Sequence, residues 1–294
     1  MWKKILLKQE IGPQDRYAMS SYLTFFETLH LLHMRGALDF ELTDELFRNR
    51  FFSAVGHPAV AGATLLKDPN SFTNITALMH DWTRYIMAND IPTPVGYPNY
   101  LTLTATSRGF EPVDLGPDDL ADLLELQAAT LTMLQGSPVL RENSAAMFTA
   151  CLTDPDHHVL GWRKDGRLVA AAILYDGGTS AESIRRYTTS DPEALAASIN
   201  LKLVITRDGF TRANLSRSLI LQLEQIAVGR GKDEILATIH PQNAASRALF
   251  GSLGYRQIGK ASTGYGTRLI YRRALTAATA DRQRSQTPWP SLRS

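Results

Sequence analysis

The loop between a predicted strand and a predicted helix is the segment best suited to bind an anion. Apolar residues predict a strand over 199–206, and a repeat of leucines starting at Leu215 predicts a helix after the loop 207–214. The first turn of a helix has backbone N–H groups without helical partners, and it carries the positive end of the helix dipole. The amides at this helix start could therefore hold a phosphate or pyrophosphate, with Arg212 adding charge and Ser216 a hydroxyl.

The segment His240–Tyr255 carries a more specific pattern of residue types. Asn243 opens a predicted helix, a small residue (Ser246) follows three positions later, an aromatic one (Phe250) seven positions later, and a Gly-Tyr pair closes the segment. This pattern resembles the segment that follows the fifth strand in the GCN5-related N-acetyltransferase (GNAT) family. The order of predicted elements over 109–275 also fits that family.

The resemblance implies a bound acyl-coenzyme A, most often acetyl-CoA. It places the thioester carbonyl at backbone N–H groups where the fourth strand separates from its neighbour, and the pyrophosphate on the amides of the loop. The Asn243 side chain would bind the pantetheine or the backbone beside it, with Ser246 and Phe250 at the thiol end. The implied cofactor-binding residues are Val204, Ile205, Thr206, Thr211, Arg212, Ala213, Asn214, Leu215, Ser216, Arg217, Asn243, Ser246 and Phe250.

The loop departs from the family's usual Gln/Arg-x-x-Gly-x-Gly/Ala pattern. Thr211, Asn214 and Ser216 occupy the three defined positions. Glycine allows a positive φ and a close approach of the backbone to phosphate, and Asn tolerates a positive φ better than most residues. Of the three departures, the replacement of glycine by Asn214 should therefore cost the least. We expect the loop to bind coenzyme A with somewhat weaker affinity than the usual pattern.

Two positions that carry a catalytic acid or base in some family members hold residues that do not titrate. Phe250 stands in the place of a Tyr acid, and Thr238 in the place of a Glu base. Alignment of the two reactants can still supply much of the rate. His240 is the nearest candidate base, and Tyr255 is a candidate hydroxyl near the thiol; a strand-end histidine and a packed core tyrosine are the competing interpretations.

Length and composition are those of an ordinary globular protein of about two domains. The chain has 294 residues, of which 44% are hydrophobic, and a net charge of +2. We expect no nucleic-acid partner at this weak charge, and no membrane span or secretory signal. The single cysteine, Cys151, fits a cytoplasmic protein without disulfides. No spacing of His, Cys and carboxylates indicates a metal site.

The second half alternates strands and helices, which predicts an α+β fold (an α/β mixed sheet) at 105–275. The Asp165-Gly166 pair between two apolar runs predicts a tight hairpin. We expect strands at 110–115, 158–162, 168–175, 199–206, 234–239, 255–258 and 267–271, and helices from 118, from 215 and over 243–253.

Residues 1–100 read as a small helical bundle, because their apolar residues recur at helical spacing. Prolines between 91 and 108 predict a linker without helix, where we place the boundary between the domains. Residues 276–294 are expected to be a basic, disordered tail. The predicted faces are Tyr22, Phe25, Phe26, Leu29 and Leu32; then Leu46, Phe47 and Phe51 after a Thr43 cap; then Phe72, Ile75, Met79, Trp82 and Ile86 after an Asp68 or Ser71 cap.

We therefore expect an acyltransferase that moves an acetyl group from acetyl-CoA to a primary amine by direct attack. The acceptor would be a small molecule or a peptide, with contacts around 133–147 and 261–266. A catalytically silent acyl-CoA sensor that signals through the helical domain stays open, because the acid and base positions are empty. A longer acyl chain also stays open. The helical domain has three open roles: covering the acceptor groove, forming a homodimer interface, or recognising a partner.

Overall fold

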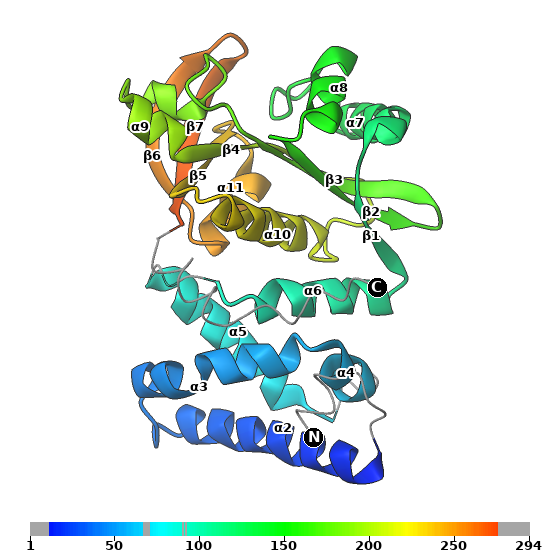
Figure 1. Ribbon diagram of the computed structural model, residues 1–294, viewed down its shortest axis with the longest axis vertical. Helices are drawn as coiled ribbons and strands as arrows, with labels where there is room; N and C mark the ends of the chain where they lie inside the picture. Colours follow the sequence, from blue (N-terminus) through cyan, green and yellow to red (C-terminus); the bar gives the residue numbers. More distant parts are fainter. Residues whose placement is uncertain (1–11, 67–70, 90, 92, 276–294) are drawn as a thin grey trace. The chain divides into compact units, whose positions relative to one another are not determined.

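The computed structural model describes residues 12–66, 71–89, 91 and 93–275 (Figure 1). It divides into two compact units, one ending at Ser107 and the other beginning at Arg108. The tail expected at 276–294 lies outside the described residues.

Helices build the first unit, as expected from the apolar spacing. Its core contains Phe26, Phe51 and Trp82, all fully buried, and the rings of Phe51 and Trp82 stack with centroids 4.9 Å apart. Aromatic pairs of this kind add to the stability that their buried area provides. The elements are α2 (Pro13–Met34), α3 (Phe40–Val55), α4 (Pro58–Val60), the π-helical turn η1 (Ala61–Leu65), α5 (Thr73–Ala88) and α6 (Gly96–Ser107).

The buried face of α2 differs in part from the predicted one. Leu23, Phe26 and Leu29 are buried, whereas Phe25 is 42% exposed and Leu32 is 40% exposed. The helix carries two overlapping apolar stripes, and the core takes only one of them. Periodicity alone could not choose between the stripes, because both have helical spacing.

The cap predicted at Thr43 is wrong. Helix α3 begins at Phe40, and the Asp39 side chain accepts the Leu42 N–H at 3.0 Å. Thr43 lies inside the helix and donates its hydroxyl to the Asp39 carbonyl. Asp39 is one turn earlier than the predicted cap, and its carboxylate is the better acceptor for the free amides of the first turn.

Helix α5 has no cap from its own N-cap residue, Phe72. Instead the Glu27 carboxylate on α2 accepts the Ile75 N–H at 2.7 Å and the Asn74 side-chain amide at 3.0 Å. Asp68, one of the predicted caps, lies outside the described residues. A cap from another helix could not be read from the local sequence.

The predicted helix-free linker contains helix α6. Pro98 occupies its first turn, where a missing N–H removes no helical hydrogen bond. The start of α6 touches the end of α3 through bare backbone, because a Cβ built at Gly96 would lie 1.9 Å from the Phe52 carbonyl oxygen. A Cβ at Gly56 would likewise lie 2.3 Å from the Gly96 oxygen. Only glycine permits this approach.

A seven-stranded mixed sheet forms the second unit, as predicted. Its order is β1-β2-β3-β4-β5-β7-β6, and β4 and β5 form its one parallel pair. The tight hairpin at Asp165-Gly166 is confirmed, with φ values of 52° and 75°. The strands are β1 (Phe110–Asp114), β2 (His158–Lys164), β3 (Arg167–Tyr175), β4 (Ser198–Thr206), β5 (Glu234–Ile239), β6 (Arg256–Thr263) and β7 (Gly266–Ala274).

Helices cover both faces of this sheet (Figure 1). Apolar residues of α7 and α8 pack on one face with Leu203 and Ile205 of β4, and α10 packs across β2, β3 and β4 on the other. Cys151 of α8 is buried in the first of these layers. The helical elements are η2 (Pro117–Asp119), α7 (Leu120–Met133), α8 (Ala145–Thr153), η3 (Ile184–Tyr187), α9 (Pro192–Ala196), α10 (Leu215–Gly229) and α11 (Ala244–Ser252).

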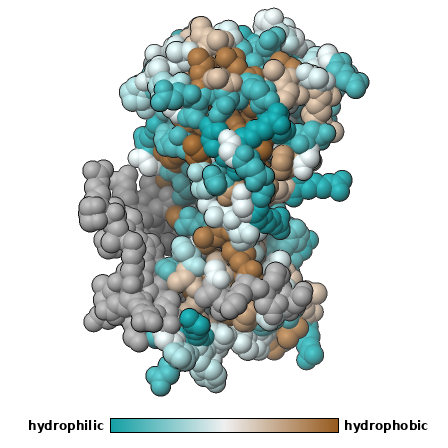
Figure 2. Space-filling view, turned by 90° about the vertical axis from the view of Figure 1, so that its right-hand side faces the viewer, coloured by the Kyte–Doolittle hydropathy of each residue, from teal (hydrophilic) through white to brown (hydrophobic). Residues whose placement is uncertain are grey.

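Hydrophilic residues cover much of the face shown in Figure 2, with hydrophobic ones lying between them. Among the described residues, no helix combines the length and the apolar character that a membrane crossing needs.

The contact between α3 and α6 gives a direct test of the helical unit. We expect Gly96→Ala to lower the free energy of unfolding by about 2 kcal/mol or more, since the added methyl group meets backbone that cannot move aside. Gly62→Ala is the matched control, because a Cβ at Gly62 meets nothing within 4 Å. Urea denaturation followed by circular dichroism measures both changes, and equal stability of the two variants would disprove the contact.

Candidate functional site

The site begins where β4 and β5 separate. The two strands pair only from Ser198 to Asn200 on β4 and from Glu234 to Leu236 on β5. Beyond these residues β4 stays paired with β3, and β5 stays paired with β7. The rest of β4 therefore has one edge that no strand covers.

The uncovered edge presents two backbone N–H groups of β4. The Arg207 N–H donates to the Val169 carbonyl on the β3 side. Because N–H groups of a strand point alternately to its two sides, the Ile205 N–H also faces β3, whereas those of Val204 and Thr206 face the opening. Of the three amides expected to meet a thioester carbonyl, only these two point the right way.

A bulge in β4 lies next to these amides. Ile173 of β3 pairs with Leu203, but the next residue, Leu174, pairs with Leu201, so Lys202 has no partner on β3. A bulge bends a strand and increases its local twist. It therefore helps to turn the end of β4 away from β5.

The start of α10 carries the amides expected to bind pyrophosphate. Asn214, the N-cap residue, has φ 60° and ψ 17°, the left-handed conformation that glycine usually supplies. The Ala213 N–H already donates to Phe210, so it is not available to a ligand. The amides of Leu215, Ser216 and Arg217 lie in the first turn, where the helix itself offers no acceptor.

Side chains fix this helix start against both neighbours. The Ser216 and Thr206 hydroxyls lie 2.7 Å apart in a hydrogen bond that joins α10 to the end of β4. The Arg217 guanidinium donates to the Ser252 hydroxyl on α11 at 2.6 Å. The side chains of Ser216 and Arg217 thus hold the start of α10 against β4 and α11, while their backbone amides stay in the first turn of the helix.

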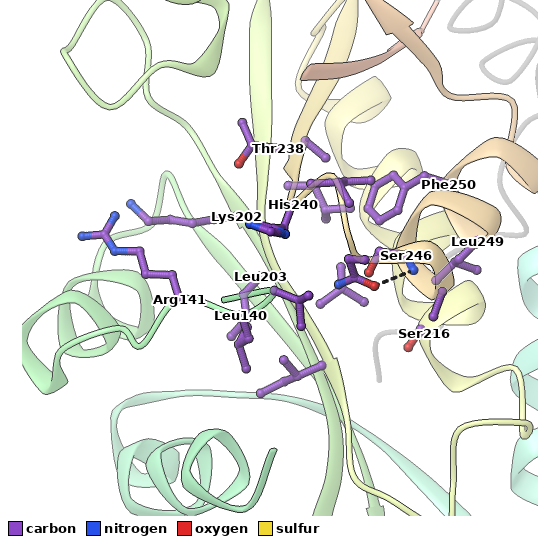
Figure 3. Close-up of a pocket in the computed structure, with 18 of the residues that line it drawn as sticks. Leu140, Arg141, Lys202, Leu203, Ser216, Thr238, His240, Ser246, Leu249 and Phe250 are labelled. Atoms are coloured by element: carbon purple, nitrogen blue, oxygen red, sulfur yellow. Dashed lines mark hydrogen bonds between the residues drawn. The ribbon is translucent and has the colours of Figure 1, made fainter. Parts of the chain in front are cut away.

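Helix α11 forms the opposite wall. The Asn243 side-chain oxygen accepts the Ser246 N–H at 3.0 Å, as the dashed line in Figure 3 shows. This cap uses the oxygen and leaves the amide NH₂ of Asn243 as a donor. Phe250 is buried and packs edge-on against Tyr255 at 4.9 Å.

These elements enclose a pocket of about 470 Å³. Figure 3 shows Arg141 and Lys202 on one side of the two strands, Ser246 and Phe250 on the other, and His240 between them. The predicted site residues that line it are Val204, Ile205, Thr206, Thr211, Asn214, Leu215, Ser216, Arg217, His240, Asn243, Ser246 and Phe250. Arg212, Ala213 and Tyr255 do not line it.

Tyr255 belongs to a buried polar cluster behind the pocket. Its hydroxyl lies near the carboxylate of Glu224 on α10 without an ordinary hydrogen bond to it, and that carboxylate lies 3.4 Å from the Arg273 guanidinium. Burial raises the pKa of Tyr255 well above its ordinary value, and burial also raises the pKa of Glu224. Tyr255 is therefore a packing residue in this structure and does not line the pocket, which favours the competing interpretation of a packed core tyrosine.

His240 lines the pocket at the end of β5, and its ring is held by the backbone. Its Nδ1 accepts the Gln242 N–H at 3.2 Å, which requires an unprotonated Nδ1 and leaves the proton on Nε2. Burial, with a contribution from Arg268, lowers the pKa of His240 below its ordinary value. The ring is therefore neutral at pH 7 and offers an N–H group, and accepting a proton would break the Gln242 bond.

The remaining lining residues bring charges that sequence reasoning did not find. Arg141, Lys202 and Arg268 line the pocket together with one carboxylate, Glu182. Lys202 donates to Glu182 at 2.9 Å, and this bond lowers the pKa of the carboxyl. The expected acceptor segments, 133–147 and 261–266, supply Arg141 and Tyr265, but their spacing in the sequence gave no signal of a cluster.

No group of three or more His, Cys, Asp or Glu side chains could hold a metal ion among the residues the structure describes. Burial raises the pKa of the Cys151 thiol to about 11, so the thiolate needed for nucleophilic attack is not formed at neutral pH.

Residues 120–255 match the model of the Acetyltransferase (GNAT) family. This segment is therefore a GNAT acetyltransferase domain, as the pattern from Asn243 to Phe250 indicated. No curated protein matches the chain by sequence.

Several solved structures are similar to the chain. An N-acetyltransferase from Thermoplasma acidophilum in complex with coenzyme A is 17% identical over 56% of this chain and 98% of its own, with a TM-score of 0.42. A putative acetyltransferase from Salmonella typhimurium with its cofactor acetyl-CoA is 18% identical over 56% and 94%, with a TM-score of 0.44. A ribosomal-protein-alanine N-acetyltransferase from Brucella melitensis is 19% identical over 56% and 99%, with a TM-score of 0.44.

The left-handed residue at the start of α10 can be tested by stability. We expect Asn214→Gly to leave the free energy of unfolding nearly unchanged, and Asn214→Val to lower it by about 1–2 kcal/mol, since a β-branched residue is strained at positive φ. Urea denaturation of the two variants checks this difference. A valine variant as stable as the glycine variant would rule out the conformation.

Proposed function

We propose that this chain, whose residues 120–255 form a GNAT acetyltransferase domain, transfers an acetyl group from acetyl-CoA to a primary amine of a small-molecule or peptide acceptor. One observation carries the proposal. The pocket runs from the amides at the start of α10 to the uncovered edge of β4 without leaving the domain. A pyrophosphate and a thioester of one ligand can therefore be held at once.

The diphosphate of the cofactor would lie on the amides of Asn214, Leu215, Ser216 and Arg217. These groups offer fixed N–H donors and the positive end of the helix dipole. Arg212 is exposed and does not line the pocket, so its contribution is limited to long-range charge. Thr211 also lines the pocket and could add its hydroxyl as a donor.

The pantetheine arm would pass between β4 and α11. The Asn243 NH₂ group can donate to it, while Ser246 and Phe250 bound the space near the thiol. Phe250 closes this end with an apolar wall, which favours the small acetyl group over a longer acyl chain. We therefore assign acetyl-CoA as the donor.

The thioester carbonyl would accept hydrogen bonds from the Val204 and Thr206 amides. Attack by the amine moves charge onto this oxygen, and fixed donors aimed at it lower the barrier. Attack forms the carbon–nitrogen bond, the carbon–sulfur bond then breaks with the sulfur leaving as the thiolate, and the proton lost by the nitrogen passes to water. Neither Thr238 nor Phe250 can supply a proton to it, so the reaction relies on the acidity of the coenzyme A thiol.

Only a neutral amine can attack the thioester. The amine must therefore enter the pocket uncharged or lose its proton there. Four cationic side chains and one carboxylate line the pocket, and nearby positive charge lowers the pKa of an ammonium group. The pocket thus favours the neutral amine without a dedicated base. His240 contributes its Nε2–H as a hydrogen-bond donor in this proposal.

Asn214→Glu tests the cofactor assignment. A carboxylate at the start of α10 would repel the diphosphate, so we expect coenzyme A binding measured by calorimetry to weaken at least 100-fold. Gln135→Glu is the matched control, because Gln135 also has a positive φ but does not line the pocket. Unchanged affinity of the Asn214 variant would contradict the phosphate site.

Thiol release from acetyl-CoA with a panel of amines tests the transfer itself. Release that depends on the amine is the expected result. Tight binding of acetyl-CoA without release on any amine would contradict it, and would favour the silent sensor that the empty acid and base positions also allow.

His240→Gln separates the two roles of the ring. Glutamine keeps an N–H donor but places it differently. We therefore expect kcat/KM to fall by about tenfold at most, which corresponds to the full loss of one hydrogen bond of ordinary strength. Loss of a general base would cost about 10²- to 10⁴-fold. A loss of that size, together with loss of the acidic limb of the pH–rate profile, would contradict the donor role.

A further inference from the structure

Two arginines share one aromatic ring at the end of the pocket away from α11. The Arg141 guanidinium carbon lies 4.4 Å from the Tyr265 ring centroid, and that of Arg268 lies 4.9 Å from it. Arg141 comes from the connection between α7 and α8, Arg268 from β7, and Tyr265 from the turn between β6 and β7. Three separate segments therefore place two like charges against one aromatic ring.

Arg268 is buried without a carboxylate beside it in the described part of the chain. Only 5% of the residue is exposed. Its two terminal nitrogens donate to the carbonyls of Thr267 and Pro138, both at 3.2 Å. A guanidinium has five N–H donors, so carbonyl contacts satisfy part of the group and leave its charge uncompensated.

No charged side chain of the pocket pairs with Arg268 among the described residues. Glu182 is the one carboxylate among the described residues that line the pocket; it pairs with Lys202 at 2.9 Å, and Arg141 also stabilises its charge. Burial lowers the pKa of Arg268, and the neighbouring Arg141 lowers it further, while Tyr265 acts in the opposite direction. Buried charges in proteins are normally paired, so this arrangement is suited to receive an anion from outside.

We propose that Arg141 and Arg268 bind a carboxylate of the acceptor, so that the acceptor is an amine that also carries a carboxylate. The inference rests on the proposed acetyl transfer and specifies its substrate class. A planar guanidinium matches a carboxylate with two parallel hydrogen bonds, and the Tyr265 ring holds both guanidiniums in place. The amine of the same molecule then lies toward the opening between β4 and β5.

The chemistry of the two arginines favours a carboxylate over a phosphate. The carbonyl oxygens of Thr267 and Pro138 lie against Arg268 and would repel a second negative charge. Glu182 adds a further negative charge to the same end of the pocket. A single charge spread over two oxygens therefore fits best.

Matched pairs of amines test the proposal with the full chain. The pairs are glycine and glycinamide, β-alanine and β-alaninamide, and 4-aminobutyrate and 4-aminobutanamide, with thiol release from acetyl-CoA as the readout. We expect kcat/KM for the acid to exceed that for the amide by about tenfold or more in at least one pair, as for a charge-assisted hydrogen bond.

Substitutions of the arginines separate binding from folding. Arg268→Gln should bring the ratio of acid to amide close to one, and Arg141→Gln, at an exposed residue, should lower it without affecting the fold. Arg268→Lys should keep part of the preference, because it keeps the charge. Arg167→Gln is the matched control, since Arg167 pairs with Glu125 outside the pocket and should leave the ratio unchanged.

The outcomes distinguish the two proposals. Thiol release without preference for the acid in any pair, or a preference for O-phosphoethanolamine over β-alanine, would overturn the carboxylate site and leave acetyl transfer standing. An equal loss for acid and amide in the arginine variants would also overturn it. No thiol release from any amine would contradict acetyl transfer and the carboxylate site together.

Discussion

The separation of β4 from β5 is the constraint on which the site depends. The two strands pair over three residues each, and each is then held by its other neighbour. A buried backbone N–H without an acceptor is costly, so an uncovered strand edge inside a domain calls for a partner. Here that edge meets a pocket, and the amides of Val204 and Thr206 remain free to bind a ligand. In our account one ligand can contact both the helix start at Asn214 and the Asn243 side chain, because the opening between β4 and β5 joins them in one pocket.

Electrostatics divide the pocket into two ends. Backbone amides and a helix dipole form one end, where a diphosphate fits, and arginine side chains form the other. In our account both ends attract anions, whereas the centre receives a neutral amine. In the proposed mechanism this division would allow Phe250 and Thr238 to stand in place of titratable residues, because the cationic surroundings favour the neutral amine and the thiolate would leave without an acid.

The sequence allowed the second unit to be predicted well and the first less well. Strands at 234–239 and 168–175, the Asp165-Gly166 hairpin and the helix opened by Asn243 depend on local residue choice, so local patterns located them. The buried face of α2, the Glu27 cap of α5 and the close approach at Gly96 depend on contacts between distant segments. The same reason hid the cluster of Arg141, Tyr265 and Arg268, which meet only in the folded domain, and the burial of Tyr255 against Phe250 and near Glu224 of α10.

Backbone amide shifts on titration with coenzyme A test the central claim most directly, because they report on each N–H group separately. The account predicts that the largest nuclear magnetic resonance shifts occur at Asn214–Arg217, Val204 and Thr206, while Ile205, whose N–H faces β3, changes less. Shifts confined to other parts of the chain, with these amides unchanged, would contradict it.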